Sequence, residues 1–286
     1  GTTCFNDMYF YPKATAQAAQ SVGIRAAIGL ITLDFPTSYA SDPDDYLNKG
    51  MAVREELMDN PLLSFCIAPH APYTVSDQSF TKALTLAEQC DLPIHLHLHE
   101  TTQELRDSQQ RFGVRPIERL CRLGLLSPSL IAAHAVHLHT DEIALLAEHG
   151  CSIAHCPSSN LKLASGIAPI SALADDGINI GLGTDGAASN NRLDMFQEMR
   201  LAALLAKGFS GKADTVGAHQ ALYMATLGGA RALGLECRIG SIAIGKSADL
   251  CAIRTDSLEL SPCYDPASLL VYAAGREHVS DVWVAG

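Results

Sequence analysis

The sequence has fewer basic than acidic residues, and it lacks the long apolar runs of membrane proteins. Its 20 lysines and arginines against 31 aspartates and glutamates give a net charge of −11. Such a charge repels polyanions. No uninterrupted apolar run reaches the roughly 18 residues of a membrane helix, and no charged segment precedes an apolar one near residue 1. We therefore expect no membrane span, no export signal and no nucleic-acid partner, and a small neutral or cationic substrate instead.

Closely spaced cysteine pairs are also missing. The nine cysteines are an odd number, and no two of them form a Cys-X-X-Cys pair. This pattern argues against a disulfide framework and against a structural zinc ribbon, and it favours a reducing, cytoplasmic location. With 286 residues, 48% of them apolar, the chain can bury a large core in one large domain or two small ones.

Strand-like and helix-like segments alternate along most of the chain. We expect strands at 2–7, 25–33, 62–68, 93–99, 130–134, 151–155 and 178–185, and helices at 12–22, 44–58, 76–90, 101–126, 140–149, 169–176 and 193–207. The helical region 101–126 is interrupted near Gly113 and Pro116. The strands are too continuously apolar for either face to be exposed, so these seven units predict a parallel α/β sheet of the barrel type.

The pattern changes near residue 236. Segments 240–253 and 279–285 alternate like antiparallel strands. We therefore predict a barrel domain over residues 1–235 and part of a small all-β appendage over residues 236–286.

Four predicted strands end in histidine or carboxylate residues. The segment Pro-Ile-His-Leu-His-Leu-His-Glu-Thr begins at Pro93 and carries histidines at every second position, so His95, His97 and His99 should share a face. His97 and Glu100 are nearest the open end of this strand. An imidazole there can hold a divalent metal while a neighbouring carboxylate moves protons, which indicates an active site built from strand tips.

Three other candidate site residues also lie at or just after the end of a predicted strand. Asp185 follows an apolar strand and could ligate a metal and accept a proton from water, and His134 ends the strand at 130–134. His70 lies on a proline-constrained loop, which favours a binding role. The alternatives are an Asx turn or helix cap for Asp185 and a buried core histidine for His134. The sequence leaves open whether His155 faces the pocket, and His95 is more typical of a core residue.

These motifs together resemble the amidohydrolase superfamily and, more narrowly, its 5-methylthioadenosine/S-adenosylhomocysteine deaminases. The matching segments are His-Leu-His-Glu-Thr from His97, Ala-His-Ala-Val-His from Ala133, Pro-Ser-Ser-Asn-Leu-Lys-Leu from Pro157 and Gly-Thr-Asp-Gly-Ala-Ala-Ser-Asn-Asn from Gly183. The resemblance covers essentially the whole chain. It implies a (β/α)8 TIM-like barrel, a β-sandwich made from both chain ends, and one zinc ion per chain.

The resemblance also implies roles for individual residues. His97 and Asp185 would bind the metal, Glu100 would shuttle protons and contact the substrate, and His134 would orient water beside Asp185. His70 and Arg25 would contact the substrate.

One element of the family pattern is missing. Relatives carry a His-X-His pair on the first barrel strand, but the first strand expected here, at 2–7, contains no histidine. We therefore expect a barrel whose first strand is missing, with two further histidine ligands supplied by a segment preceding Gly1.

The function implied is hydrolytic deamination of adenosine thioethers to inosine analogues and ammonia, by a protein expected to form a homo-oligomer. A metal-activated water would attack the purine while Glu100 protonates the ring. The alternatives are guanine or cytosine deamination, chloride displacement from a triazine, and an inactive fragment.

Overall fold

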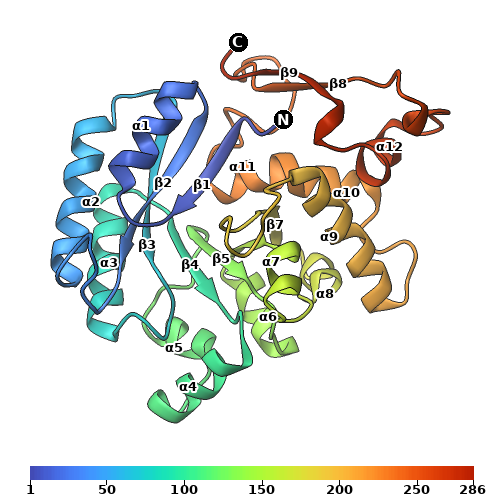
Figure 1. Cartoon of the computed structure of the whole chain (residues 1–286). Coiled ribbons are helices and arrows are strands. Elements are labelled where there is room, and N and C mark those ends of the chain that lie inside the picture. Colours follow the sequence, from blue (N-terminus) through green and yellow to red (C-terminus); the bar gives the residue numbers. More distant parts are fainter.

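Seven parallel strands form one curled sheet in this computed structural model, which describes residues 1–286 (Figure 1). The strands lie in chain order, and each pairs in parallel with its neighbours along the chain. They are β1 (Cys4–Met8), β2 (Arg25–Thr32), β3 (Leu63–Pro69), β4 (Ile94–Leu98), β5 (Leu130–His134), β6 (Ser152–His155) and β7 (Asn179–Leu182). The sheet is a half-barrel of the α/β class, which agrees with a TIM-like fold.

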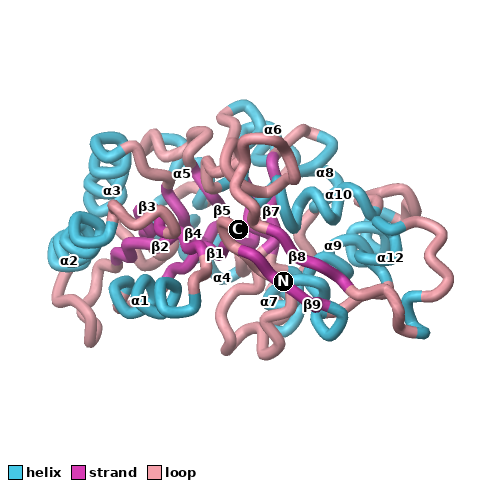
Figure 2. The backbone as a smooth tube through the Cα atoms, turned by 90° about the horizontal axis from the view of Figure 1, so that it is seen from above, coloured by secondary structure: helices cyan, strands magenta, loops and turns pink.

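Helices follow the strands, and most of them lie on the outer side of the sheet (Figure 2). They are α1 (Pro12–Val22), α2 (Pro43–Leu57), α3 (Asp77–Cys90), α4 (Thr102–Phe112), α5 (Pro116–Arg122), α6 (Thr140–Glu148), α7 (Pro157–Lys162), α8 (Ile170–Asp175) and α9 (Met195–Ser210). After α9 come α10 (Ala218–Tyr223), a π-helical turn η1 (Met224–Gly228) and α11 (Gly229–Ala232). None of the helices combines the length and apolar composition required to cross a bilayer.

The seven predicted strand and helix units are confirmed, with ends that shift by a few residues. Helix α1 begins at Pro12 and ends before Gly23, whose φ of 70° suits glycine. Helix α3 begins after Ser76, whose side chain accepts a hydrogen bond from the Ser79 amide. The short helices α7, α10 and α11 and the turn η1 were not predicted.

The core lies between the sheet and its helices. A cluster of 41 buried apolar residues runs through it, and all eight residues of β2 are buried. Glycine permits one close contact at the end of the sheet: a Cβ on Gly228 would lie 2.3 Å from the carbonyl oxygen of Ile180 in β7. The turn η1 can therefore pack directly on the backbone of the last strand.

The C-terminal segment differs from the all-β prediction. Only β8 (Leu250–Ile253) and β9 (Val279–Trp283) pair, as an antiparallel ribbon. Between them lie the 3₁₀ turns η2 (Leu258–Leu260) and η3 (Arg276–His278) and the helix α12 (Pro266–Tyr272), which packs on α9 and α10 (Figure 1). The alternating stretch before β8 forms no strand, and its isoleucines are exposed: Ile242 is 90% exposed and Ile244 is 108% exposed. The predicted β-sandwich is not confirmed.

A buried ion pair joins the C-terminal segment to the start of the barrel. Arg25, the first residue of β2, donates two hydrogen bonds of 3.0 Å to the carboxylate of Asp249. The two side chains are only 4% and 2% exposed. Arg25 also donates to the Pro61 carbonyl, and Asp249 also accepts from the Ala285 amide. The bidentate geometry and the additional bonds satisfy both buried charges.

We expect Arg25→Ala to lower the free energy of unfolding by about 3 to 5 kcal/mol, because it leaves the Asp249 carboxylate buried without a partner. The double change Arg25→Met with Asp249→Leu should recover most of this loss. Denaturant unfolding would measure both. Arg254→Ala is the control, because its partner Asp256 is 67% exposed, and it should leave the unfolding midpoint unchanged. Equal midpoints for the Arg25→Ala and Arg254→Ala variants would contradict this role.

Candidate functional site

Five of the predicted site residues lie at the carboxyl-terminal edge of the sheet. His97 is in β4, His134 ends β5, and His70, Glu100 and Asp185 follow β3, β4 and β7. In a parallel sheet these strand ends share one edge, so the side chains are brought together.

Left-handed backbone conformations concentrate at this edge. His99 has a φ of 54°, His134 of 74° and Asp185 of 59°. Such angles are uncommon for residues other than glycine and cost free energy, and they cluster at functional sites. Each one turns the chain sharply out of its strand.

His97 is the central imidazole of the group. The centroid of its ring lies 4.8 Å from that of His70, 5.4 Å from that of His134 and 6.2 Å from that of His95. Its Nδ1 donates a 2.7 Å hydrogen bond to the His70 carbonyl, because a carbonyl can only accept. Burial, and then the neighbouring His134, lower the pKa of His97. The ring is therefore neutral with its Nε2 lone pair available, the form that binds a metal.

Asp185 supplies a carboxylate fixed by three hydrogen bonds. Its Oδ2 accepts from the hydroxyls of Ser159 at 2.6 Å and Ser189 at 2.7 Å, and its Oδ1 accepts from the Gly186 amide at 2.7 Å. Burial would raise the pKa of Asp185, but these hydrogen bonds outweigh it and hold the pKa below its usual value. The group is therefore an ionised, oriented carboxylate.

His134 and Glu100 form the third part of the group. The His134 ring stacks on His97, and its Nδ1 donates a 2.8 Å hydrogen bond to Oδ1 of Asn160. His134 Nε2 therefore lies 4.0 Å from a carboxylate oxygen of Glu100. A base and an acid are thus held beside the neutral ring of His97, which can support proton transfer.

His70 borders the group from the loop after β3. Its Nδ1 lies 2.9 Å from the Thr74 hydroxyl, and Tyr73 stands edge-on to its ring. Burial, and then His97, lower the pKa of His70 to about 4. The ring is neutral at physiological pH and has one nitrogen left for a ligand.

His99 does not share the face of His95 and His97, contrary to the strand pattern. The left-handed bend directs its ring away, where Nδ1 donates to the His137 carbonyl and Nε2 accepts from the Ile117 amide. His95 and His155 are buried beside the group, and burial lowers the pKa of each to about 3. Both behave as interior residues.

Arg25 lies at the opposite edge of the sheet, which corrects its expected substrate contact. It begins β2, whereas the site lies where the strands end, and its guanidinium is engaged by Asp249 and the Pro61 carbonyl. A buried, fully paired guanidinium at the amino-terminal edge cannot reach a ligand at the carboxyl-terminal edge. Nothing in the sequence around Arg25 indicates that it pairs with Asp249.

Three residues beside the site were not assigned a role from the sequence: Glu104, Ser159 and Asn160. Ser159 and Asn160 hold Asp185 and His134, and both stand in the Pro-Ser-Ser-Asn motif. Glu104 accepts from the amides of His99 and Glu100. The signal for it was the capping-box spacing from Thr101 to Glu104.

The metal-ligating groups at this edge are of the right kind for a divalent metal, but they are few. A neutral imidazole with a free Nε2 and an ionised carboxylate are ordinary zinc ligands. No group of three or more His, Cys, Asp or Glu side chains is arranged to hold a metal.

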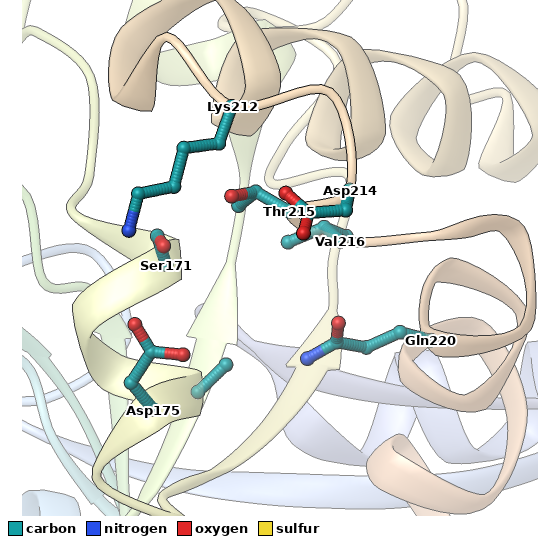
Figure 3. A pocket seen from close by; sticks show the side chains of 8 residues that line it. Ser171, Asp175, Lys212, Asp214, Thr215, Val216 and Gln220 are labelled. Carbon is teal, nitrogen blue, oxygen red and sulfur yellow. The ribbon is translucent and has the colours of Figure 1, made fainter.

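A cavity of about 230 Å³ lies elsewhere, between α8 and the segment joining α9 to α10 (Figure 3). Ser171, Asp175, Lys212, Thr215 and Gln220 line it. It has no histidine and shares no residue with the strand-end group, so we do not assign the candidate site to it.

The whole chain is similar to known hydrolases. A family model described as "Amidohydrolase family" matches residues 1–286. A 5-methylthioadenosine/S-adenosylhomocysteine deaminase from Teredinibacter turnerae is 46% identical over 100% of this chain and 65% of its own length. This chain thus spans less than two thirds of that relative.

Two solved structures have the same fold. An adenosine deaminase from Xanthomonas campestris with bound zinc is 50% identical, with a TM-score of 0.98 over 100% of this chain and 65% of that chain. An atrazine chlorohydrolase from Arthrobacter aurescens TC1 complexed with zinc is 28% identical, with a TM-score of 0.89 over 99% of this chain and 66% of that one.

We expect the 286-residue chain by itself to bind Zn²⁺ weakly, because His97 and Asp185 are two protein ligands where catalytic zinc sites generally use three. Titration calorimetry with metal-free protein would measure the affinity, with Asp185→Asn as the control. Stoichiometric binding that survives dialysis against a chelator would show that the chain holds a complete site.

Proposed function

The chain belongs to the amidohydrolase family, and on this premise we propose that the protein hydrolytically deaminates adenosine thioethers. The substrates would be 5′-methylthioadenosine and S-adenosylhomocysteine, and the products their inosine analogues and ammonia. The relative from Teredinibacter turnerae is named for these substrates, and the zinc-containing structure from Xanthomonas campestris is named an adenosine deaminase. Both names describe removal of the amino group from an adenine ring.

One observation carries the proposed chemistry. The neutral His97, the ionised Asp185 and the neighbouring pair of His134 and Glu100 meet at one edge of the sheet. Together they offer ligands for a metal, a base and a proton donor, which is what hydrolysis at an aromatic carbon requires.

We propose that His97, through Nε2, and Asp185 would hold a divalent metal, with zinc favoured by the two zinc-containing relatives. When bound, such a metal lowers the pKa of a coordinated water towards 7. A working site needs at least one further ligand beyond these two residues.

The residues of this chain would then divide the remaining work. The carboxylate of Asp185 and Nε2 of His134 would accept hydrogen bonds from the attacking water and hold it against C6 of the purine. Glu100 would deliver a proton to ring nitrogen N1 as the C6–O bond forms. Asp185 would take the proton that the water releases and pass it to the amino group, so that the C6–N bond breaks and ammonia leaves, while the C6 hydroxyl returns a proton to Glu100 as the carbonyl forms. His70 would contact the substrate.

We also propose that the seven-stranded sheet belongs to a (β/α)8 barrel and that the β8–β9 ribbon belongs to a β-sandwich. The domains would be residues 1–235 and 236–286. The sequential parallel order of the strands and the family membership support the first proposal. The exposed isoleucines before β8 support the second, because a facing sheet would cover them.

Triazine chlorohydrolysis is the alternative with a specific relative. The atrazine chlorohydrolase is 28% identical to the chain, whereas the adenosine deaminase is 50% identical. The higher identity to the adenosine deaminase favours deamination.

Substrate competition tests this assignment in the full-length protein. We expect kcat/KM for 5′-methylthioadenosine and S-adenosylhomocysteine to exceed that for guanine, cytosine, AMP and atrazine. The acidic composition of the chain disfavours the phosphorylated nucleotide. Ammonia release and the absorbance change of the purine would measure turnover. A higher kcat/KM for guanine, cytosine, AMP or atrazine would overturn the substrate assignment.

We expect Glu100→Gln to lower kcat by about 10⁴-fold while metal stays bound, because general acid–base transfer is worth about 10² to 10⁴ and an amide cannot supply it. Asp185→Asn should lower both metal content and kcat, because it weakens a ligand. Metal analysis beside steady-state kinetics separates the two. Loss of metal from the Glu100 variant, or more than about a tenth of wild-type kcat, would rule out this division of roles.

A further inference from the structure

We propose that Glu104 is a positioning residue that holds the backbone of Glu100, so that the Glu100 carboxylate faces the reacting ring. This inference rests on the proposed role of Glu100. It concerns a buried carboxylate on α4 that is not part of the site described above.

Both carboxylate oxygens of Glu104 are used on the strand-to-helix connection. Oε1 accepts a 2.8 Å hydrogen bond from the His99 amide, and Oε2 accepts a 2.8 Å bond from the Glu100 amide. Glu104 is only 2% exposed, so burying it is costly unless its oxygens are satisfied. A carboxylate that accepts hydrogen bonds from two successive amides fixes the backbone of the residue between them, which is His99.

His99 is where the chain bends. His99 has a φ of 54°, a strained angle for a residue with a side chain. Its ring is fixed on both sides, by the His137 carbonyl and the Ile117 amide. Glu104 stabilises the residue after the bend. Without these contacts the strand could continue straight, and Glu100 would turn away from His134.

The contacts of Glu104 exceed what a helix cap alone needs. In a capping box the first-turn glutamate accepts from the amide of the N-cap residue. Here Thr101 is the N-cap and accepts from the Glu104 amide, but Glu104 accepts from the two residues before Thr101. Helix capping and the positioning of Glu100 are therefore separable by substitution.

The main variant is Glu104→Gln in the full-length, zinc-loaded protein. Its amide can accept only one of the two N–H groups, and its NH₂ opposes the other. We expect kcat to fall by about 10- to 100-fold, as small misplacements of reacting groups do, with KM and metal content within about threefold of wild type. Burial raises the pKa of Glu104 to about 7, so assays at about pH 8.5 keep the wild-type carboxylate ionised.

Thr101→Ala is the matched control. It removes the N-cap bond from the Glu104 amide to the Thr101 hydroxyl but leaves both bonds to the Glu104 carboxylate in place, so kcat should stay within about threefold of wild type. If Glu104→Gln does not fold, Glu104→Asp replaces it. The aspartate withdraws both oxygens by one methylene, and kcat should fall at least threefold.

A double-mutant cycle separates positioning from a general structural effect. If Glu104 acts through Glu100, adding Glu104→Gln to Glu100→Gln costs no more than about threefold beyond Glu100→Gln alone. A full multiplicative loss in the double variant, or wild-type kcat in the Glu104 variant, overturns the inference.

Amide hydrogen exchange gives a readout that does not depend on turnover. We expect the amides of His99 and Glu100 to exchange faster in Glu104→Gln than in wild type or in Thr101→Ala. Unchanged protection overturns the inference even where kcat falls. A wild-type protein without deaminase turnover would instead defeat the proposed function, with exchange still reporting whether Glu104 holds the bend.

Discussion

The site depends on one geometric constraint, which is that all seven strands run parallel and in chain order. This arrangement directs every strand's carboxyl end to the same edge, so residues far apart in sequence meet without long loops. It also places the leading end of each helix near that edge. Where the chain leaves β4, β5 and β7 it turns through the left-handed residues His99, His134 and Asp185. Backbone strain and candidate chemistry therefore coincide at His134 and Asp185.

Hydrogen bonds from neighbouring segments decide the chemical state of each candidate group. The His70 carbonyl makes His97 present Nε2, and the Asn160 amide oxygen does the same for His134. Two serines and an amide keep Asp185 ionised. None of these supporting groups would react itself. They come from the segments that follow β3, β6 and β7, so hydrogen bonds join neighbouring strand ends at this edge.

The sequence predicted the repeating architecture well, because buried parallel strands leave apolar runs and capped helices leave Ser, Gly and Pro signals. It also predicted His97, Glu100, His134 and Asp185 as a group, because strand-end positions are readable from those runs. Other features could not be read in this way. The orientation of the His99 ring depends on a bend held by Glu104. The role of Arg25 depends on a partner 224 positions away. The structure of the C-terminal segment depends on packing that an alternating sequence alone does not encode.

The pair of Arg25 and Asp249 also has a consequence for how the chain is made. Its partners are separated by 224 positions, and ribosomes add about 5 to 20 residues per second, so Asp249 is synthesised roughly 10 to 45 seconds after Arg25. During that interval the guanidinium must remain hydrated at the amino-terminal edge of the sheet. The amino-terminal edge of the nascent sheet therefore stays hydrated around Arg25 until Asp249 emerges. The carboxyl-terminal edge, which carries the histidines, can assemble before then.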